Sequence, residues 1–388
     1  MLAAGAALAM LLAATGCGAF FQCEGKTSCG TASGGGSTGT GDYVYVSYNI
    51  SGNNYIGGYT VGSNTLTTIT GSPFAVGYVP VGMAVSPNNE FLYVAALPGT
   101  SDSGVWMYTI NSAGAVTGGT QEDSDLIGAM AVSPDGNFLF EIDSGTGTII
   151  TEYKLNTSTG AMTYVSTFSA PGTSLVGCAL TSTALLNGAP SSQNCSIAVA
   201  PTDDYVAVAL NTVGTAIFPY TSSGGLANNN YVTIPPPSSL SGDYSLAFDG
   251  TDHLYVASTA QLTPYNSLAS PVAGIGYSAY ESGATPRSVT LSTTYGYLFT
   301  ANEGTSDIQE FTVSGGAVTA LGTTPHVTGP ASVSALGVDR SGTYLLAAGY
   351  NSTNGLQMFT ISSTGLTAVA NQGTGSVTTV PVLIALTH

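Results

Sequence analysis

Cationic side chains are nearly absent from this sequence of 388 residues, which has four Lys plus Arg against 21 Asp plus Glu and a formal net charge of −17. Such a chain repels a phosphate backbone and has almost nothing with which to neutralise it, so nucleic acid is excluded as a partner. Anionic membrane surfaces are disfavoured for the same reason. A phosphorylated ligand would have to be held by very few cations.

Charged residues of either sign make up only 6% of the chain, whereas 43% of it is hydrophobic. The chain can therefore bury a large core beneath a surface of Ser, Thr, Asn and Gly, which suits a secreted protein. The sequence has no Cys/His zinc spacing, no phosphate-cradling Gly-Lys loop and no serine nucleophile elbow. Ser and Gly are so common here that a chance match carries no information. We expect no cofactor, with calcium as the one exception considered below.

The N-terminus has an apolar run, residues 2–14, that is too short to span a bilayer and ends in Ala14-Thr15-Gly16-Cys17. It resembles a bacterial lipoprotein signal, which implies cleavage after residue 16 and lipidation of Cys17. The alternative is an ordinary cleaved secretory signal. Residues 17–41 form a Cys-, Gly- and Ser-rich tether that cannot pack a core, so the folded domain is expected from residue 42 to residue 388.

Lipidation of Cys17 would leave four of the five cysteines. Cys23 and Cys29 are close in the tether, while Cys178 and Cys195 flank the longest interval of the repeat described next. Outside the cytoplasm both pairs are plausible disulfides, although four cysteines allow three connectivities. The alternative for Cys195 is a free buried thiol.

A short apolar strand recurs seven times, and its last residues lie 47, 67, 49, 43, 47 and 48 positions apart. Such a period, with aromatic-rich strands and turns between, is typical of four-stranded blades stacked around an axis. The sequence therefore predicts an all-β, seven-bladed β-propeller. The predicted inner strands are Met83-Ala84-Val85, Met130-Ala131-Val132, Ile197-Ala198-Val199, Leu246-Ala247-Phe248, Val289-Thr290-Leu291, Leu336-Gly337-Val338 and Ile384-Ala385-Leu386.

The two ends of the chain complete the count. Residues 381–387 form an inner strand with nothing after it, and residues 43–70 supply three strands with no inner strand before them. We expect the termini to share a blade, which removes the free sheet edges of an open array. The predicted third strands carry one aromatic each, expected between blades: Tyr108, Tyr153, Tyr220, Tyr265, Phe311 and Phe359.

Hairpin topology places loops on the two rims of the ring. Each inner strand and the strand after it are antiparallel, so the start of the first and the end of the second lie on one rim, here called the top rim. An insertion at about residues 166–194 enters an inner strand and should overhang this rim. A long loop there would either cover the channel or be a decoration. The predicted rim residues Asn49, Asn211, Thr259 and Tyr350 are uncharged.

One stretch of the sequence carries a family resemblance: Thr285-Pro286-Arg287-Ser288, the strand ending in Asn302-Glu303, and the segment Ser306 to Phe311. It resembles the seven-bladed propeller lactonases, which include propeller-type phosphogluconolactonases. That family tends to have Pro-Arg-His before one inner strand and Asn-Glu after its partner. Arg287 and Glu303 occupy those places, and both are expected at the top rim, near enough to form an ion pair.

The resemblance implies that Arg287 steadies the oxyanion of an opening lactone while Glu303 orients or deprotonates water. The chain departs from the family at Ser288, where His is usual, at Tyr244-Ser245 and at Tyr350. His326, in a loop at the same rim, is the candidate for a substitute base. The alternative for Arg287 and Glu303 is a structural salt bridge.

A second group of candidates is acidic: Asp102, Glu122, Asp123, Asp125 and Asp143 are expected near one another on the top rim. Calcium takes several oxygen ligands, so a site is conceivable, although no calcium-loop spacing is present and surface acids are usually only solvated.

Three functions follow from these observations. The first is an exported, lipid-anchored propeller of the cell envelope that hydrolyses a non-phosphorylated sugar lactone at the top of the channel. The second is a non-catalytic surface propeller that binds a glycan or a protein, and the third is a structural envelope component. We expect a monomer that contacts the membrane only through its lipid.

Overall fold

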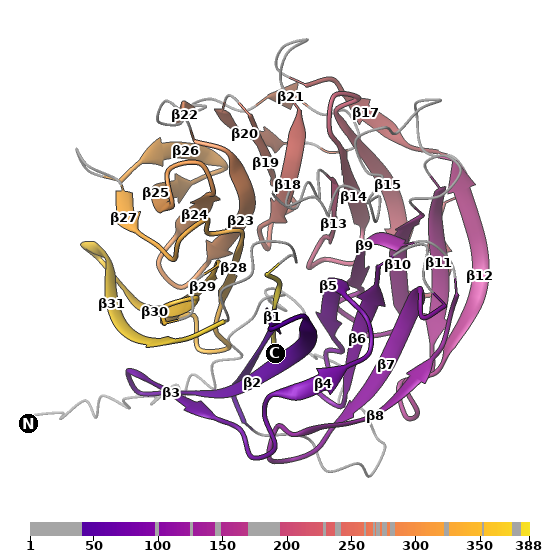
Figure 1. The fold of residues 1–388 in the computed structure, drawn as a ribbon. Helices are drawn as coiled ribbons and strands as arrows, with labels where there is room; N and C mark the ends of the chain where they lie inside the picture. The colour runs from indigo at the N-terminus through magenta and orange to yellow at the C-terminus, as the bar shows by residue number, and fades with distance from the viewer. Residues whose placement is uncertain are drawn as a thin grey trace, which may run out of the picture.

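The computed structural model describes residues 41–97, 101–124, 127–143, 149–169, 195–227, 230–236, 242–259, 261–266, 268, 272–273, 278–279, 284–321, 326–350, 353–374 and 382–388. These residues form seven separate antiparallel sheets, arranged as blades around a ring (Figure 1). None of the described segments forms a helix long and apolar enough to span a membrane. The predicted seven-bladed β-propeller is confirmed.

Each blade places its innermost strand beside the ring axis, at one end of its sheet. These strands contain the seven predicted apolar triplets. Their small, apolar residues suit a position where seven strands converge. The inner strands are β5 (Pro80–Val85), β9 (Ile127–Val132), β13 (Cys195–Val199), β18 (Asp243–Phe248), β23 (Pro286–Ser292), β28 (Ala335–Val338) and β32 (Ile384–Leu386).

Two further strands follow in each blade, rich in the aromatic and β-branched residues that fit a buried sheet. The second strands are β6 (Phe91–Ala96), β10 (Phe138–Asp143), β14 (Tyr205–Leu210), β19 (Leu254–Ser258), β24 (Tyr297–Asn302), β29 (Tyr344–Ala348) and β1 (Tyr43–Ile50). The third strands are β7 (Gly104–Ile110), β11 (Ile149–Leu155), β15 (Thr215–Thr221), β20 (Gln261–Asn266), β25 (Asp307–Ser314), β30 (Leu356–Ser362) and β2 (Asn53–Gly62).

The outer strand is continuous in three blades and split in four. The continuous ones are β8 (Val116–Gln121), β12 (Met162–Ser169) and β31 (Gly365–Gln372). The split ones are β3 (Thr65–Thr68) with β4 (Phe74–Val76), β16 (Gly225–Leu226) with β17 (Val232–Ile234), β21 (Val272–Ala273) with β22 (Ser278–Ala279), and β26 (Ala317–Ala320) with β27 (His326–Thr328). In each split case both pieces pair with the third strand. Residues 166–169 of the predicted insertion belong to β12, and residues 170–194 lie outside the described residues.

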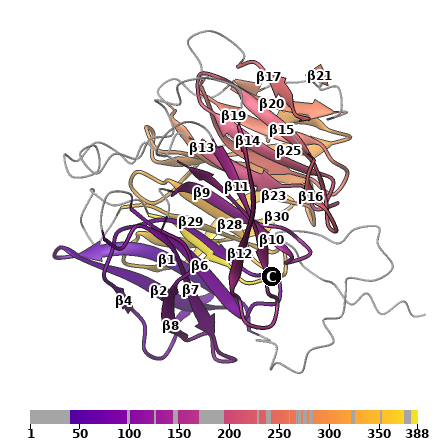
Figure 2. The same ribbon diagram turned by 90° about the vertical axis from the view of Figure 1, so that its right-hand side faces the viewer.

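The ring closes between the two ends of the chain. β1 pairs with β32 in antiparallel register, so that Tyr45 lies opposite Ala385. Figure 1 shows the indigo first blade beside the yellow last one, and Figure 2 shows the same ring after a quarter turn. Contacts between inner strands follow the cycle β5, β9, β13, β18, β23, β28, β32 and back to β5. The expectation that the termini share a blade is confirmed.

The core is divided among the blade interfaces. Seven clusters of buried apolar side chains are present in the described part of the chain, and each one joins two neighbouring blades. All six predicted third-strand aromatics belong to these clusters, as expected. Second-strand tyrosines add hydrogen bonds across the interfaces: the hydroxyl of Tyr45 donates to Gly114 O at 2.8 Å, and that of Tyr93 donates to Gly160 O at 2.8 Å. No blade could bury both of its faces alone, so the ring is the cooperative unit.

Candidate functional site

Arg287 and Glu303 meet at the top rim of the β23 blade. Arg287 lies at an irregularity between Pro286 and Ser288, where the register of β23 with β24 shifts, and Glu303 directly follows β24. The Glu303 N–H donates to Thr285 O at 3.0 Å and so extends the ladder by one bond. Arg287 Nε donates to Glu303 Oε2 at 2.6 Å. The predicted ion pair is therefore formed.

The pair is held on a second side by the neighbouring blade. The guanidinium carbon of Arg287 lies 5.5 Å from the centre of the Tyr244 ring, which comes from β18. A cation over an aromatic face is attracted by the quadrupole of the ring. The side chain of Arg287 is 14% exposed and that of Glu303 is 9% exposed, so water reaches only part of the pair. Arg287 thus ties two blades together while it keeps an accessible edge.

Ser245 and Ser288 lie where the sequence departs from the lactonase pattern, and each links two inner strands. Ser245 Oγ, in β18, accepts the Val289 N–H of β23 at 3.0 Å. Ser288 Oγ, in β23, accepts the Leu336 N–H of β28 at 3.1 Å. Each hydroxyl satisfies the N–H of an edge strand, so both serines have a structural role in holding neighbouring blades together.

His326 lies at the outer side of the same blade. It belongs to β27, which pairs with β25, and it lies opposite Gln309. Its Nδ1 is 3.8 Å from Asp307 Oδ2, and Asp307 Oδ1 accepts a bond of 2.8 Å from the amide of the buried Asn302. β23 and β27 are three strand spacings apart, which amounts to roughly 14 Å. His326 and Arg287 are therefore on one blade but at opposite sides of it.

Asp243 is a buried carboxyl that the sequence pattern did not single out. It begins β18 immediately before Tyr244, is 1% exposed and accepts the Thr215 hydroxyl at 2.8 Å. Burial raises the pKa of Asp243 to about 6, while the Thr215 hydroxyl opposes this rise. Its position depends on packing between two blades, which explains why no local motif marks it.

The acidic candidates do not assemble a metal site within the described residues. There, no three His, Cys, Asp or Glu side chains are grouped so as to hold a metal ion. Glu122 accepts the Met162 N–H at 3.0 Å, and Asp123 accepts the Tyr153 hydroxyl at 3.0 Å. Asp125 lies outside the described residues, as does the side chain of Asp143.

The cysteine predictions also fall outside the described residues. This holds for Cys17, Cys23, Cys29 and Cys178, and for the side chain of Cys195, whose backbone begins β13. Lipidation and both disulfides stay predictions.

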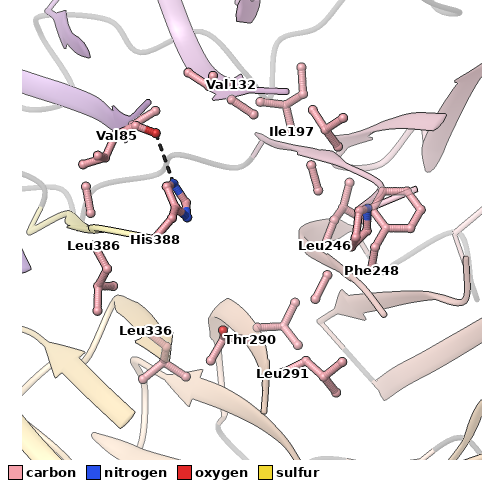
Figure 3. A pocket seen from close by; sticks show the side chains of 18 of the residues that line it. Val85, Val132, Ile197, Leu246, Phe248, Thr290, Leu291, Leu336, Leu386 and His388 are labelled. Carbon is pink, nitrogen blue, oxygen red and sulfur yellow. Dashed lines mark hydrogen bonds between the residues drawn. The ribbon is translucent and has the colours of Figure 1, made fainter. Parts of the chain in front are cut away.

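A cavity of about 200 Å³ occupies the channel between the inner strands. Side chains from successive blades surround it, and His388 lies at its edge (Figure 3). The His388 ring bonds Val85 O at 3.2 Å, and burial lowers the pKa of His388 to about 4, so the ring is neutral near pH 7. Arg287 and Glu303 are not part of the lining.

A scan against protein-family models finds no match, and a search of curated protein sequences finds none either. Solved structures do match. A protein from Bacteroides fragilis, provisionally assigned as a 6-phosphogluconolactonase, aligns with a TM-score of 0.68 and 16% identity over 91% of this chain and 99% of its own. The periplasmic gluconolactonase PpgL of Pseudomonas aeruginosa aligns with a TM-score of 0.60 and 14% identity over 90% and 99%.

This chain shares the fold of the lactonase-type propellers. A protein from Lactobacillus plantarum has the same arrangement, with a TM-score of 0.67 and 16% identity over 90% of this chain and 99% of its own. At these identities the likeness concerns the fold, and the chemistry has to be argued from the residues present.

Proposed function

We propose that this propeller hydrolyses an uncharged lactone at its top rim, with Arg287 and Glu303 as the reacting pair. The observation that carries the proposal is the 2.6 Å contact between Arg287 Nε and Glu303 Oε2, in a pair that remains partly exposed on a lactonase-type fold. The carboxylate can act as a base and the guanidinium can stabilise an oxyanion, and ester hydrolysis uses both functions.

Each group has a defined task in the proposed reaction. The carboxylate of Glu303 orients a water molecule and takes its proton as the water oxygen adds to the lactone carbonyl carbon. The guanidinium of Arg287, a planar donor with five N–H groups, stabilises the oxyanion that forms. The ring C–O bond then breaks, the proton passes to the departing ring oxygen, and a hydroxy acid is released.

The cations of the described residues favour a substrate without phosphate. Lys154 is exposed on the third strand β11, and Arg340 follows the inner strand β28 at the rim opposite Arg287. Arg287 is already paired with a carboxylate, and the chain carries a formal net charge of −17. A phosphate dianion would meet repulsion with little compensation, whereas a neutral sugar lactone would not.

The test is hydrolysis of a panel of neutral sugar lactones by the protein and its Arg287→Gln and Glu303→Gln variants, after subtraction of spontaneous opening. We expect kcat/KM to fall at least about a hundredfold in each variant, in line with the loss of one oxyanion donor or of the base. Lys154→Gln, which removes an exposed cation from the third strand β11, should leave turnover unchanged. The proposal would be refuted if both rim variants turned over the lactones as fast as the parent protein, or if the parent protein itself showed no turnover. The search would then turn to a bound glycan or protein.

We further propose that the protein is exported and anchored through a lipid on Cys17. The apolar run before Ala14-Thr15-Gly16-Cys17 supports this, and one structural neighbour is described as periplasmic. Metabolic labelling with a palmitate analogue tests it. The label should enter the protein and be lost from Cys17→Ser, and an unlabelled, membrane-free protein would contradict the anchor.

A further inference from the structure

The channel cavity is a second site, distinct from the top rim. Its lining includes Pro201, Gly250, Thr293 and His388, all of which follow the ends of inner strands. On β23 the lining begins at Val289, two positions beyond Arg287. The cavity therefore occupies the half of the channel toward the rim opposite the Arg287–Glu303 pair, here called the bottom rim.

The middle of the inner strands keeps the channel open. Five of the seven strands carry Ala at this level, and the other two carry Thr290 and Gly337. Four of the alanines remain partly exposed although they lie beside the ring axis: Ala84, Ala131, Ala198 and Ala247. A side chain at the centre of a fold keeps accessible surface only beside a hollow, so the cavity is real space and the small residues maintain it.

The lining excludes ions. It holds no Lys, Arg, Asp or Glu, and its polar side chains are Thr290, Thr293 and His388. His388 Nε2 donates to Val85 O when the ring is neutral, and Figure 3 shows that ring at the channel wall. An ion entering the cavity would lose its hydration without gaining a charged partner among the lining side chains, which is strongly unfavourable. An occupant is therefore uncharged.

The walls still offer hydrogen bonds. Each inner strand is the edge of its sheet, so alternate backbone N–H and C=O groups have no strand partner on the channel side. The serine bonds to Val289 N and Leu336 N satisfy two such groups near the top, and the His388 bond to Val85 O satisfies one near the bottom. The Thr290 hydroxyl, which lines the cavity at intermediate height (Figure 3), can bond one hydroxyl or carbonyl of a ligand.

We propose that the channel binds a neutral, hydrocarbon-rich small molecule with a single hydroxyl or carbonyl, which enters from the bottom rim. An apolar cavity of about 150 Å³ is known to take up benzene, so the 200 Å³ present here suits a slightly larger molecule. The proposal does not rest on lactone hydrolysis, because none of the lining residues belongs to the rim pair.

A pair of matched probes tests this site by ¹⁹F NMR. 4-Fluorobenzyl alcohol is neutral and has one hydroxyl, whereas 4-fluorobenzoate has the same shape and a charge. The ¹⁹F resonance of the alcohol should broaden and shift when the protein is added, and the resonance of the benzoate should not. Equal behaviour of the two probes, or no response to either, would overturn the proposal.

Variants locate the binding within the channel. Ala131→Leu should weaken alcohol binding about tenfold or more, equivalent to 1.4 kcal/mol, because the larger side chain fills the hollow. Ala113→Leu, in an exposed turn, is the matched control and should bind as the parent protein does. Ala198→Val makes a smaller change in the next blade and serves if the first variant does not fold. Undiminished binding by folded channel variants would place the probe elsewhere and refute the proposal.

Discussion

The side-chain oxygen of Ser245 accepts a hydrogen bond of 3.0 Å from the backbone N–H of Val289, and so connects β18 to β23. Inner strands of neighbouring blades do not share a sheet, and such a bond fixes their relative height. Ser245 thus supplies a structural bond between two blades at one of the places where the sequence departs from the lactonase pattern.

Removal of this bond should be costly for stability. In Ser245→Ala the Val289 N–H has lost its acceptor, and leaving a buried donor unsatisfied costs about 1–3 kcal/mol. Urea denaturation followed by tryptophan and tyrosine fluorescence measures the change. Ser158→Ala, at an exposed turn position, is the control and should be within about 0.5 kcal/mol of the parent protein. A loss no larger than that of the control would contradict the role of Ser245.

Position 89 requires both side-chain hydrogen bonds and a positive φ, and variants can separate these two requirements. Its side chain donates to His388 O and accepts the His388 N–H, both at 2.7 Å, and its φ is +61°. Asn89→Gly keeps the backbone angle and loses the two bonds. Asn89→Ala loses the same bonds and keeps a Cβ in the left-handed region, so it should be less stable than the glycine variant by about 1 kcal/mol. We expect the stability order Asn, Gly, Ala in thermal and urea unfolding, and an alanine variant as stable as the glycine one would show that the backbone is not strained.

Asp42 should make the protein less stable as pH rises. Burial, followed by the neighbouring Asp339, raises the pKa of Asp42 from 3.8 to about 8. Between about pH 4 and pH 8 the folded state therefore retains a proton that the unfolded chain has released, and the free energy of unfolding falls with increasing pH. Asp42→Asn should gain stability relative to the parent over this window and not below it. The exposed Asp204→Asn is the comparison, and parallel pH profiles for the parent protein and Asp42→Asn would contradict the prediction.

His388 should make the protein less stable as pH falls. Burial lowers its pKa from 6.5 to about 4, so the unfolded chain binds a proton between these values that the folded state does not. Its contribution to stability is complete above about pH 6.5 and declines as pH falls toward 4. The chain has three histidines, so the ring proton of His388 can be assigned by NMR with His388→Asn. Its chemical shift should stay constant from pH 8 down to about pH 5, and a midpoint near 6.5 would contradict the lowered pKa of His388.

The ring architecture could be predicted because its signal is local and repeated. Apolar triplets at a regular spacing indicate inner strands, and an unpaired triplet at residues 384–386 leaves β1 as its partner, which the Tyr45–Ala385 register confirms. The family resemblance singled out Arg287 and Glu303, and hairpin geometry predicted that they pair, since the start of one strand and the end of the next must lie on the same rim.

Other features depend on contacts between blades and left no mark in the sequence. The acceptor role of Ser288 involves a backbone N–H 48 residues away, which any residue type could supply. His326 lies in β27, which pairs with β25 on the outer side of the blade. The raised pKa of Asp243 results from burial between two sheets. The channel cavity depends on seven small residues, none of which marks a cavity by itself.

The bond between Tyr43 N and the Thr387 hydroxyl joins residues 344 positions apart, and it lies in the blade that closes the ring. During synthesis β1 emerges well before its partner β32, so the edge of β1 stays uncovered while the blades between them are made. An unpaired strand edge recruits other chains. Chains truncated before β32 would thus keep an open seam at β1, and we expect such products to aggregate.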